Sequence, residues 1–234
     1  ADGTCRHISF QVHQGEIFGM AGLVGAGRTE TMEAIFGAVP RSAGQVYLHG
    51  KELEIADPYS AIKQGIGMLT ENRRELGFSK NFTCKQNIAL APTIKASTFG
   101  GLGGMLDKKK DERWAREQIS VLNVKCTGPE QMTVDLSGGN QQKVILGKWL
   151  AAESEVLIFD EPTKGIDVGS KSEIYQLMRR LAEAGKAVLM VSSEQTELLS
   201  VCDRIAVFHA GELKAVLEGK TATEEDIVRI STGE

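Results

Sequence analysis

Short apolar runs separated by helix-type sequence predict an α/β fold for this chain. Two of these runs, at 156–159 and 187–191, are continuous, as is typical of strands buried on both faces of a parallel sheet. Sequence with a helical period lies between them at 170–184, so we expect a right-handed strand-helix-strand crossover. The apolar segment 16–20 predicts another strand of the same core.

Other segments predict the edges of this core. Residues 8–12 alternate between apolar and polar side chains, which predicts a half-exposed strand. A helical pattern runs from Thr29 to Phe36 and ends at Gly37. Two hairpins are expected, one over 44–53 that turns at His49-Gly50 and one that joins 204–208 to 213–217 through Gly211.

The middle of the chain has a different character and predicts a mainly helical lobe over about 72–150. Ala115, Ile119 and Leu122 recur at the spacing of one helix face. The glycine-rich stretch 98–104 predicts a surface loop and not a second phosphate site, because no Lys or Ser/Thr follows it in register. We therefore expect one domain over 1–234, with a core formed by 1–71 and 151–234.

Composition agrees with one globular domain, since 41% of the 234 residues are hydrophobic. Lys and Arg total 27 against 31 Asp and Glu, so the charge balance does not favour a nucleic-acid partner. The charged run 107–113 predicts the solvated start of a helix, with contact to phosphate or lipid as the alternative.

The cysteine pattern indicates a reducing compartment, and the hydropathy pattern predicts no membrane span. Cys5, Cys84, Cys126 and Cys202 lie far apart without a C-x-x-C motif, which disfavours a zinc site and a secreted disulfide framework, so we expect buried or half-buried free thiols. No run approaches the ~20 apolar residues that span a bilayer, and no signal-peptide pattern begins the chain. We expect a cytosolic or peripheral protein.

Residues 22–29, Gly-Leu-Val-Gly-Ala-Gly-Arg-Thr, match the phosphate-binding loop G-x-x-x-x-G-K-[ST] at every position but one. The glycines allow the backbone to turn its N–H groups toward phosphate oxygens, and the following helix adds its positive end. Arg28 replaces the lysine that normally reaches the transferred phosphate. The predicted nucleotide-binding residues are Gly22, Leu23, Val24, Gly25, Ala26, Gly27, Arg28, Thr29 and Glu30.

Two carboxylates follow the strand at 156–159 and strengthen this interpretation. A carboxylate at the carboxyl end of a core strand lies beside the phosphate loop, where Asp160 would hold magnesium together with Thr29. Glu161 points the other way across the pleat, so it is the candidate catalytic residue that orients an attacking water.

A second candidate anion site opens a helix at residues 136–142, Leu-Ser-Gly-Gly-Asn-Gln-Gln. Ser137 is placed as the N-cap, and Gly138 and Gly139 leave backbone N–H groups bare. With this motif the chain resembles the nucleotide-binding domain of ATP-binding cassette (ABC) transporters, whose signature is L-S-G-G-Q. The phosphate loop, the signature and residues 156–163, Val-Leu-Ile-Phe-Asp-Glu-Pro-Thr, occur in that family's order.

The resemblance implies a P-loop fold with a mixed sheet, an antiparallel β subdomain and a helical lobe. It also implies ATP and Mg²⁺ as cofactors and head-to-tail pairing of two domains, so that each ATP lies between one phosphate loop and the other domain's signature. The matching signature residues here are Ser137, Gly138, Gly139, Asn140 and Gln141, and 165–167 falls at the family's contact loop. In that family, closure on ATP and opening after hydrolysis drive the attached membrane subunits between inward-facing and outward-facing states.

Several positions depart from the family pattern. Glu71 stands where members usually have a glutamine, and it joins the candidate magnesium ligands. Ser193 stands where they place a histidine, and no adenine-stacking aromatic is matched within 1–18; His209 is expected to be structural or exposed. Arg28, Glu71 and Ser193 together suggest that this site binds ATP and hydrolyses it slowly or not at all, because each lost contact to the transferred phosphoryl group typically costs ~10²-fold in rate.

The signature shows no such change, which predicts a partner cassette whose intact site this signature completes. In this asymmetry the chain resembles the second cassette of tandem ATPases in bacterial monosaccharide importers, with autoinducer and nucleoside importers as close relatives in motif. The resemblance implies a preceding cassette, a membrane permease, a solute-binding protein and a location on the cytoplasmic face of the membrane. Two alternatives remain: a soluble ABC ATPase of translation or DNA repair, and a purely regulatory nucleotide-binding module.

Overall fold

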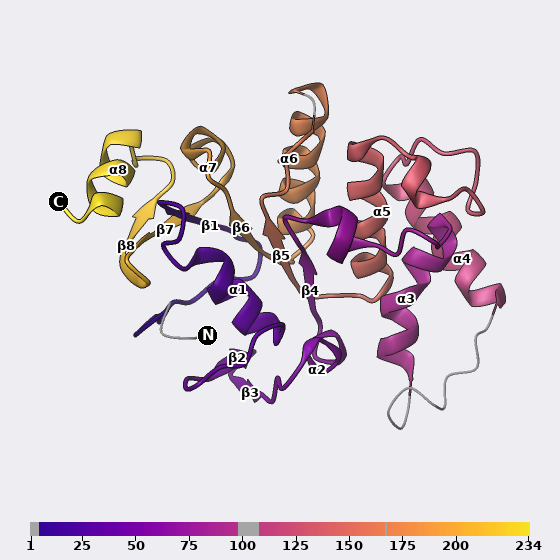
Figure 1. Cartoon of the computed structure of the whole chain (residues 1–234), viewed down its shortest axis with the longest axis horizontal. Helices are drawn as coiled ribbons and strands as arrows, with labels where there is room; N and C mark the ends of the chain where they lie inside the picture. The colour runs from indigo at the N-terminus through magenta and orange to yellow at the C-terminus, as the bar shows by residue number, and fades with distance from the viewer. Residues whose placement is uncertain (1–4, 98–107, 167) are drawn as a thin grey trace.

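A six-stranded mixed sheet forms the centre of the computed structural model, which describes residues 5–97, 108–166 and 168–234 (Figure 1). The strand order is β4-β5-β6-β1-β7-β8, with β8 antiparallel to β7 and every other neighbouring pair parallel. A separate antiparallel pair is formed by β2 and β3. The strands are β1 (Ile17–Gly22), β2 (Val46–Leu48), β3 (Lys51–Leu53), β4 (Ile66–Leu69), β5 (Val156–Asp160), β6 (Ala187–Val191), β7 (Arg204–His209) and β8 (Glu212–Glu218).

Helices flank the sheet, and α3, α4 and α5 pack together beyond β4 at one end of the molecule (Figure 1). These three helices and two short helical turns all lie in the segment between β4 and β5. The helices are α1 (Arg28–Phe36), α2 (Pro58–Lys63), α3 (Cys84–Ala96), α4 (Lys108–Val121), α5 (Gly138–Ala151), α6 (Val168–Glu183), α7 (Gln195–Val201) and α8 (Glu224–Thr232), with a π-helical turn η1 (Arg73–Gly77) and a 3₁₀ turn η2 (Thr133–Asp135).

The predicted core strands are confirmed, because β1, β5 and β6 are buried apolar strands that lie parallel to one another. Phe18 and Phe159 are fully buried in this sheet. Removal of such side chains from water is the main favourable term in folding, so continuous apolar runs end up in the central strands. The helix between β5 and β6 is α6, as the crossover requires.

Helix α5 is fixed to the sheet by two neighbouring side chains. The ring of Trp149 covers β4 at Gly67, where a Cβ would lie only 2.9 Å from the indole Cγ. Lys148 is buried, donates to the Gly77 carbonyl at 2.8 Å and lies over the Trp149 ring. Burial lowers the pKa of Lys148 to about 8. The last turn of α5 is thereby held in a defined place relative to β4 and η1.

Both predicted hairpins are confirmed. His49 and Gly50, with φ of 52° and 75°, form the two-residue turn between β2 and β3, as a type I′ turn requires. Ala210 and Gly211 also have positive φ and connect β7 to β8. From Leu213 onward the residues of β8 alternate between half-buried and exposed, so Lys214, Val216 and Glu218 form one solvated face.

The prediction of a strand over 8–12 is wrong. Among the described residues this segment joins no strand pair, although its side chains alternate in exposure as predicted. Phe10 stacks on Phe18 at 5.4 Å between ring centroids, and Ile8 and Val12 also pack against the core. One-sided packing of an extended segment produces the same alternation as a strand, so the pattern alone did not distinguish them.

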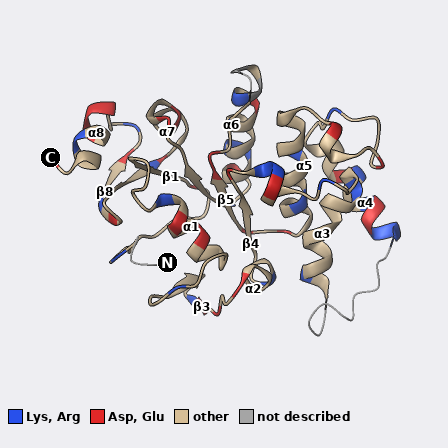
Figure 2. Ribbon diagram, viewed as in Figure 1, with Lys and Arg blue, Asp and Glu red and all other residues tan. Residues whose placement is uncertain are grey.

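Of the remaining sequence predictions, some agree with the structure and others concern residues that it does not describe. Lys108, Lys109 and Lys110 begin α4 and are exposed, which confirms the solvated helix start; Figure 2 shows them as a blue turn. The His209 ring bonds to the Ser231 carbonyl at 2.8 Å, which agrees with a structural role. The glycine-rich stretch 98–104, the aspartate at 107 and Asp167 of the predicted contact loop lie outside the described residues.

The four cysteines are free thiols, two of them buried and two half-buried, as predicted. Burial raises the pKa of Cys84 to about 11, which keeps this thiol protonated at neutral pH. Within the described part of the chain, no helix combines the length and the apolar content that crossing a bilayer requires.

Candidate nucleotide-binding site

The phosphate loop connects β1 to α1 at the carboxyl edge of the parallel strands. Gly27 caps α1 with a φ of 94°, a left-handed conformation that residues with a side chain rarely adopt. Leu23 and Val24 are exposed at the tip of the loop. The carboxyl ends of β5 and β6 lie next in the sheet, so the residues that follow them share this edge. Ligands bind at such an edge in open α/β sheets.

Arg28 lies below the loop and is only 8% exposed. Its Nη1 donates to the carbonyl oxygen of Ser192, the residue after β6, at 2.7 Å. Burial lowers the pKa of the guanidinium, while the carboxylates of Glu161 and Asp160 act in the opposite direction. The replacement for the usual lysine is therefore engaged with the protein's own backbone and carboxylates.

Thr29 and Asp160 come together as predicted, with the Thr29 hydroxyl donating to the Asp160 carboxylate at 3.1 Å. Asp160 is 2% exposed, and burial raises its pKa to about 6, with further contributions from Glu71, Glu161 and Glu33. A buried carboxylate crowded by others is stabilised by a cation, and a hydroxyl with a carboxylate suits the oxygen chemistry of Mg²⁺. These residues fit a magnesium ion.

The described residues contain no group of three His, Cys, Asp or Glu side chains able to hold a metal by themselves. Mg²⁺ commonly keeps several waters and binds through one or two protein ligands together with substrate phosphates. The pair of Thr29 and Asp160 is consistent with that mode of binding.

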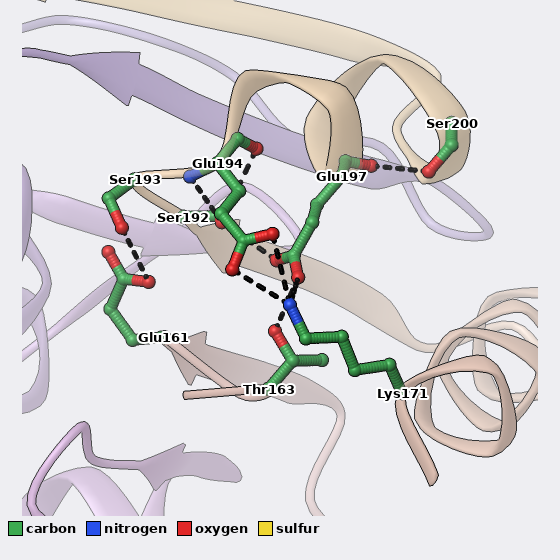
Figure 3. Close-up of polar contacts among 8 residues, drawn as sticks. All are labelled: Glu161, Thr163, Lys171, Ser192, Ser193, Glu194, Glu197 and Ser200. Carbon is green, nitrogen blue, oxygen red and sulfur yellow. Dashed lines mark hydrogen bonds and ion pairs between the residues drawn. The ribbon is translucent and has the colours of Figure 1, made fainter. Parts of the chain in front are cut away.

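Glu161 begins the turn after β5 in a strained conformation, with a φ of 47°. Its backbone N–H donates to the Val191 carbonyl at 3.0 Å, and its carboxylate accepts from the Ser193 hydroxyl at 3.3 Å (Figure 3). Burial raises the pKa of Glu161, although the Ser193 hydrogen bond and the Arg28 charge oppose this shift. A carboxylate with a raised pKa at this edge is suited to general-base chemistry.

The predicted signature begins α5, with Ser137 at the N-cap position. The Ser137 hydroxyl accepts from the Asn140 amide at 2.8 Å, and the Asn140 side-chain oxygen accepts from the Lys125 N–H at 2.8 Å. Gln141 donates to the Leu136 carbonyl at 3.0 Å. A cavity of about 130 Å³ opens here and is lined by Lys125, Ser137, Gly139, Asn140, Lys143, Glu173 and Ile174. This end of α5 is open and its N–H groups are available to an anion.

Two elements suited to phosphate therefore occur on different segments of one chain. Residues 5–164, which include both, match the family model described as ABC transporter. The chain belongs to the ABC transporter family.

Curated relatives of this ABC domain include sugar-import proteins. The D-allose import ATP-binding protein AlsA of Escherichia coli K12 is 48% identical and is matched over 95% of this chain and 44% of its own length. The ribose import ATP-binding protein RbsA of Lactococcus lactis subsp. cremoris SK11 is 49% identical, over 97% of this chain and 46% of its own length. The chain thus spans about half the length of the curated relatives it matches.

Solved ABC cassettes share the fold. The dimeric cassette MJ0796 in a post-hydrolysis state with ADP and Pi has a TM-score of 0.77 at 21% identity, covering 94% of this chain and 92% of that one. A nucleotide-free ATP-binding cassette from an ABC transporter has a TM-score of 0.78 at 20% identity, covering 98% and 89%. The α/β P-loop fold with a mixed sheet is confirmed.

Two of the departures from the ABC pattern have direct partners in the structure. Glu71 forms an ion pair of 2.5 Å with Lys164, and both side chains are exposed. Glu71, predicted as a magnesium ligand, therefore has a lysine as its nearest partner, although its charge contributes to the raised pKa of Asp160. Ser193 is turned toward Glu161, as described above.

One buried network of this ABC domain was missed by sequence reasoning. The Glu197 carboxylate, 5% exposed, accepts from Thr163 at 2.7 Å, Ser192 at 2.8 Å and Lys171 at 2.9 Å (Figure 3). Burial by itself would raise the Glu197 pKa, but these donors and Tyr175 hold it below its usual value. The network joins the turn after β5 to the end of β6, to α6 and to α7. The sequence signal for this network was the presence of hydroxyl residues close to acidic ones, Thr163 after Glu161 and Ser192 before Glu194.

Proposed function

We propose that this chain is an ATP-binding unit of an importer for a monosaccharide or similar small solute. The support is the near 50% identity to allose and ribose import ATP-binding proteins, together with a phosphate loop and a signature in one domain. Because those relatives are about twice as long as this chain, we propose that it works beside a second cassette. We further propose a membrane permease and a solute-binding protein as partners, and a position on the cytoplasmic face of the membrane.

Within the domain, we propose that residues 22–30 hold the phosphates of ATP, with Thr29 and Asp160 holding Mg²⁺ and Glu71 near it. Bound Mg²⁺ would neutralise phosphate charge at this edge. We propose that Glu161 orients a water and accepts its proton. We propose residues 72–150 as the helical lobe that carries the signature, on a core formed by 1–71 and 151–234.

The proposal that this site is slow is carried by Arg28. Its guanidinium is buried and bonded to the Ser192 carbonyl, beside Glu161 and Asp160. A planar guanidinium is larger than an ammonium, so it does not take the place of a lysine in a tight loop without displacement. Ser193 also lacks the reach and the charge of the usual histidine. The signature residues, Ser137 to Gln141, retain an open helix end and are proposed to complete the partner's site.

ATP hydrolysis by the purified chain with Mg²⁺ tests this proposal. We expect binding of a fluorescent ATP analogue with very slow phosphate release, and Glu161→Gln should change that release little. Vigorous turnover that Glu161→Gln abolishes would contradict a slow site. Co-purification with a two-subunit membrane permease would support the importer function over a soluble ABC ATPase.

A further inference from the structure

Arg73, the first residue of η1, connects two loops at the edge of the candidate site. Its Nη1 donates to the Lys164 carbonyl at 2.8 Å and its Nη2 to the Gly165 carbonyl at 3.3 Å. Lys164 and Gly165 belong to the turn that follows Glu161. The Arg73 side chain therefore reaches from the segment after β4 to the segment after β5, with two donors from one rigid fork.

The same guanidinium lies against the first residue of the signature helix. A Cβ at Gly138 would be 2.7 Å from Arg73 Nη2 and 3.6 Å from the Gly165 carbonyl oxygen. Gly138 does not have the left-handed φ that would itself call for glycine, so the constraint at this position is space. The absence of a side chain at Gly138 lets Arg73 lie between the signature and the turn.

A second contact supports this arrangement. Lys164 forms its ion pair with Glu71, and the Arg73 N–H donates to the Glu71 carbonyl at 3.0 Å. The backbone bond holds Glu71 and Arg73 together within their own segment, and the side chains of both residues join that segment to the turn at 164–165. An exposed ion pair contributes little alone, so the two hydrogen bonds of Arg73 are the stronger part of this junction.

We propose that Arg73 is a positioning residue that holds the turn at 164–165 beside the signature end of α5. The two segments then meet the opposing ATP site as one unit, and this part of the inference rests on the proposed function of the signature. Arg73 has this effect through its hydrogen bond to the Gly165 carbonyl and its contact with Gly138.

Hydrogen exchange of the 234-residue chain without nucleotide tests the junction itself. The turn contains two hydrogen-bonded amides, Lys164 N–H to Glu161 O and Ile166 N–H to Thr163 O. In Arg73→Gln we expect these amides to exchange about tenfold faster, because hydrogen bonds from a charged donor are lost, while β1 and β6 stay protected. Arg74→Gln removes the same charge from an exposed neighbour in the same turn and should leave the exchange unchanged. Equal exchange in wild type and Arg73→Gln would overturn the inference.

A double-mutant cycle in the assembled transporter tests the functional part. We expect Arg73→Gln to lower kcat by about tenfold to a hundredfold and to leave KM nearly constant. The reason is that a small displacement of groups near the reacting phosphate slows the chemical step more than it weakens binding. Arg73→Lys should recover only part of the lost kcat. Gly138→Ala should cost less in Arg73→Gln than in wild type, because the clash is already relieved. If the effects of Arg73→Gln and Gly138→Ala on kcat are additive, the inferred contact between Arg73 and Gly138 is wrong. If kcat is unchanged in Arg73→Gln, the inferred role of Arg73 in activity is wrong.

Failure of the proposed function gives a different result. If Ser137→Arg leaves the transporter's ATPase activity unchanged, the signature does not complete an opposing site. Faster exchange in Arg73→Gln would in that case still support the positioning of the turn.

Discussion

At the scale of single residues, the candidate site is marked by charged groups that are buried close together. Asp160 and Glu161 have raised pKa values, and Arg28 has a lowered one, each chiefly because of burial. Such groups cost folding free energy unless a partner offsets them. Buried charged groups that lower the stability of the fold are typical of functional sites, so their presence at the carboxyl edge of the sheet supports this edge as the candidate site.

Asp160→Asn should therefore stabilise the nucleotide-free domain near neutral pH. The folded pKa of Asp160 is about 6, above the ordinary 3.8, so the folded state holds more protons than the unfolded state between about pH 4 and 6. The free energy of unfolding falls as pH rises through that window and the full cost is present above it. We expect Asp160→Asn to gain roughly 2 kcal/mol at pH 7.5 and almost nothing at pH 4, measured by urea unfolding.

The exposed residue Glu52 on β3 provides the control for this prediction, since Glu52→Gln removes a carboxylate that is not buried. Its unfolding free energy should follow the wild-type pH dependence. A stability difference between wild type and Asp160→Asn that is the same at pH 4 and pH 7.5 would show that Asp160 does not carry the raised pKa.

At the scale of elements, the site depends on how helices and strands are joined behind it. The Glu197 network connects α7 to α6, to the turn after β5 and to the end of β6, where Ser192 also accepts from Arg28. On the other side, Trp149 and Lys148 fix α5 to β4 and η1. Buried polar groups of this kind favour one arrangement, because a displaced donor would be left without a partner.

Glu197→Gln should lower the free energy of unfolding by about 2 kcal/mol, since the new amide hydrogens face donors and the buried carboxylate's charge is lost. Glu194→Gln is the matched control: Glu194 also pairs with Lys171, but its side chain is 54% exposed. Its effect should stay below about 0.5 kcal/mol. Chemical denaturation of both variants measures the contrast, and equal losses would mean that burial of Glu197 adds nothing.

At the scale of the whole molecule, the phosphate loop and the signature are open ends on separate segments of one domain. A head-to-tail pair would use both, with this chain's signature facing the partner's ATP. We propose this pairing because the chain belongs to the ABC transporter family and carries both the phosphate loop and the signature. It predicts unequal consequences for damage at the two ends.

In the assembled transporter, Ser137→Arg should lower ATP hydrolysis about a hundredfold, because a large side chain blocks the helix end that stabilises the opposing phosphate. Arg28→Ala should leave most of the activity, since this chain's own site is proposed to contribute little. Steady-state phosphate release measures both. The reverse order of effects would place the productive site on this chain and contradict the proposed asymmetry.

Much of this molecule follows from its sequence by itself. The apolar runs at β5 and β6 determined buried parallel strands, and His49-Gly50 determined a hairpin, because burial and left-handed φ act locally on residue type. The spacing of the phosphate loop, of Asp160 and Glu161 and of the signature placed the candidate site on one sheet edge and one helix end.

Tertiary structure alone decided which side chains meet. The alternation at 8–12 reflected packing of Phe10 on Phe18 and not a strand, since exposure pattern does not encode hydrogen-bond partners. Nothing local joined Arg28 to Ser192, Glu197 to Thr163, or Arg73 to Gly165 and Gly138, because these partners lie between 34 and 164 residues apart and meet only when the sheet assembles. Residue types determined the chemistry available, and the packed fold decided its partners.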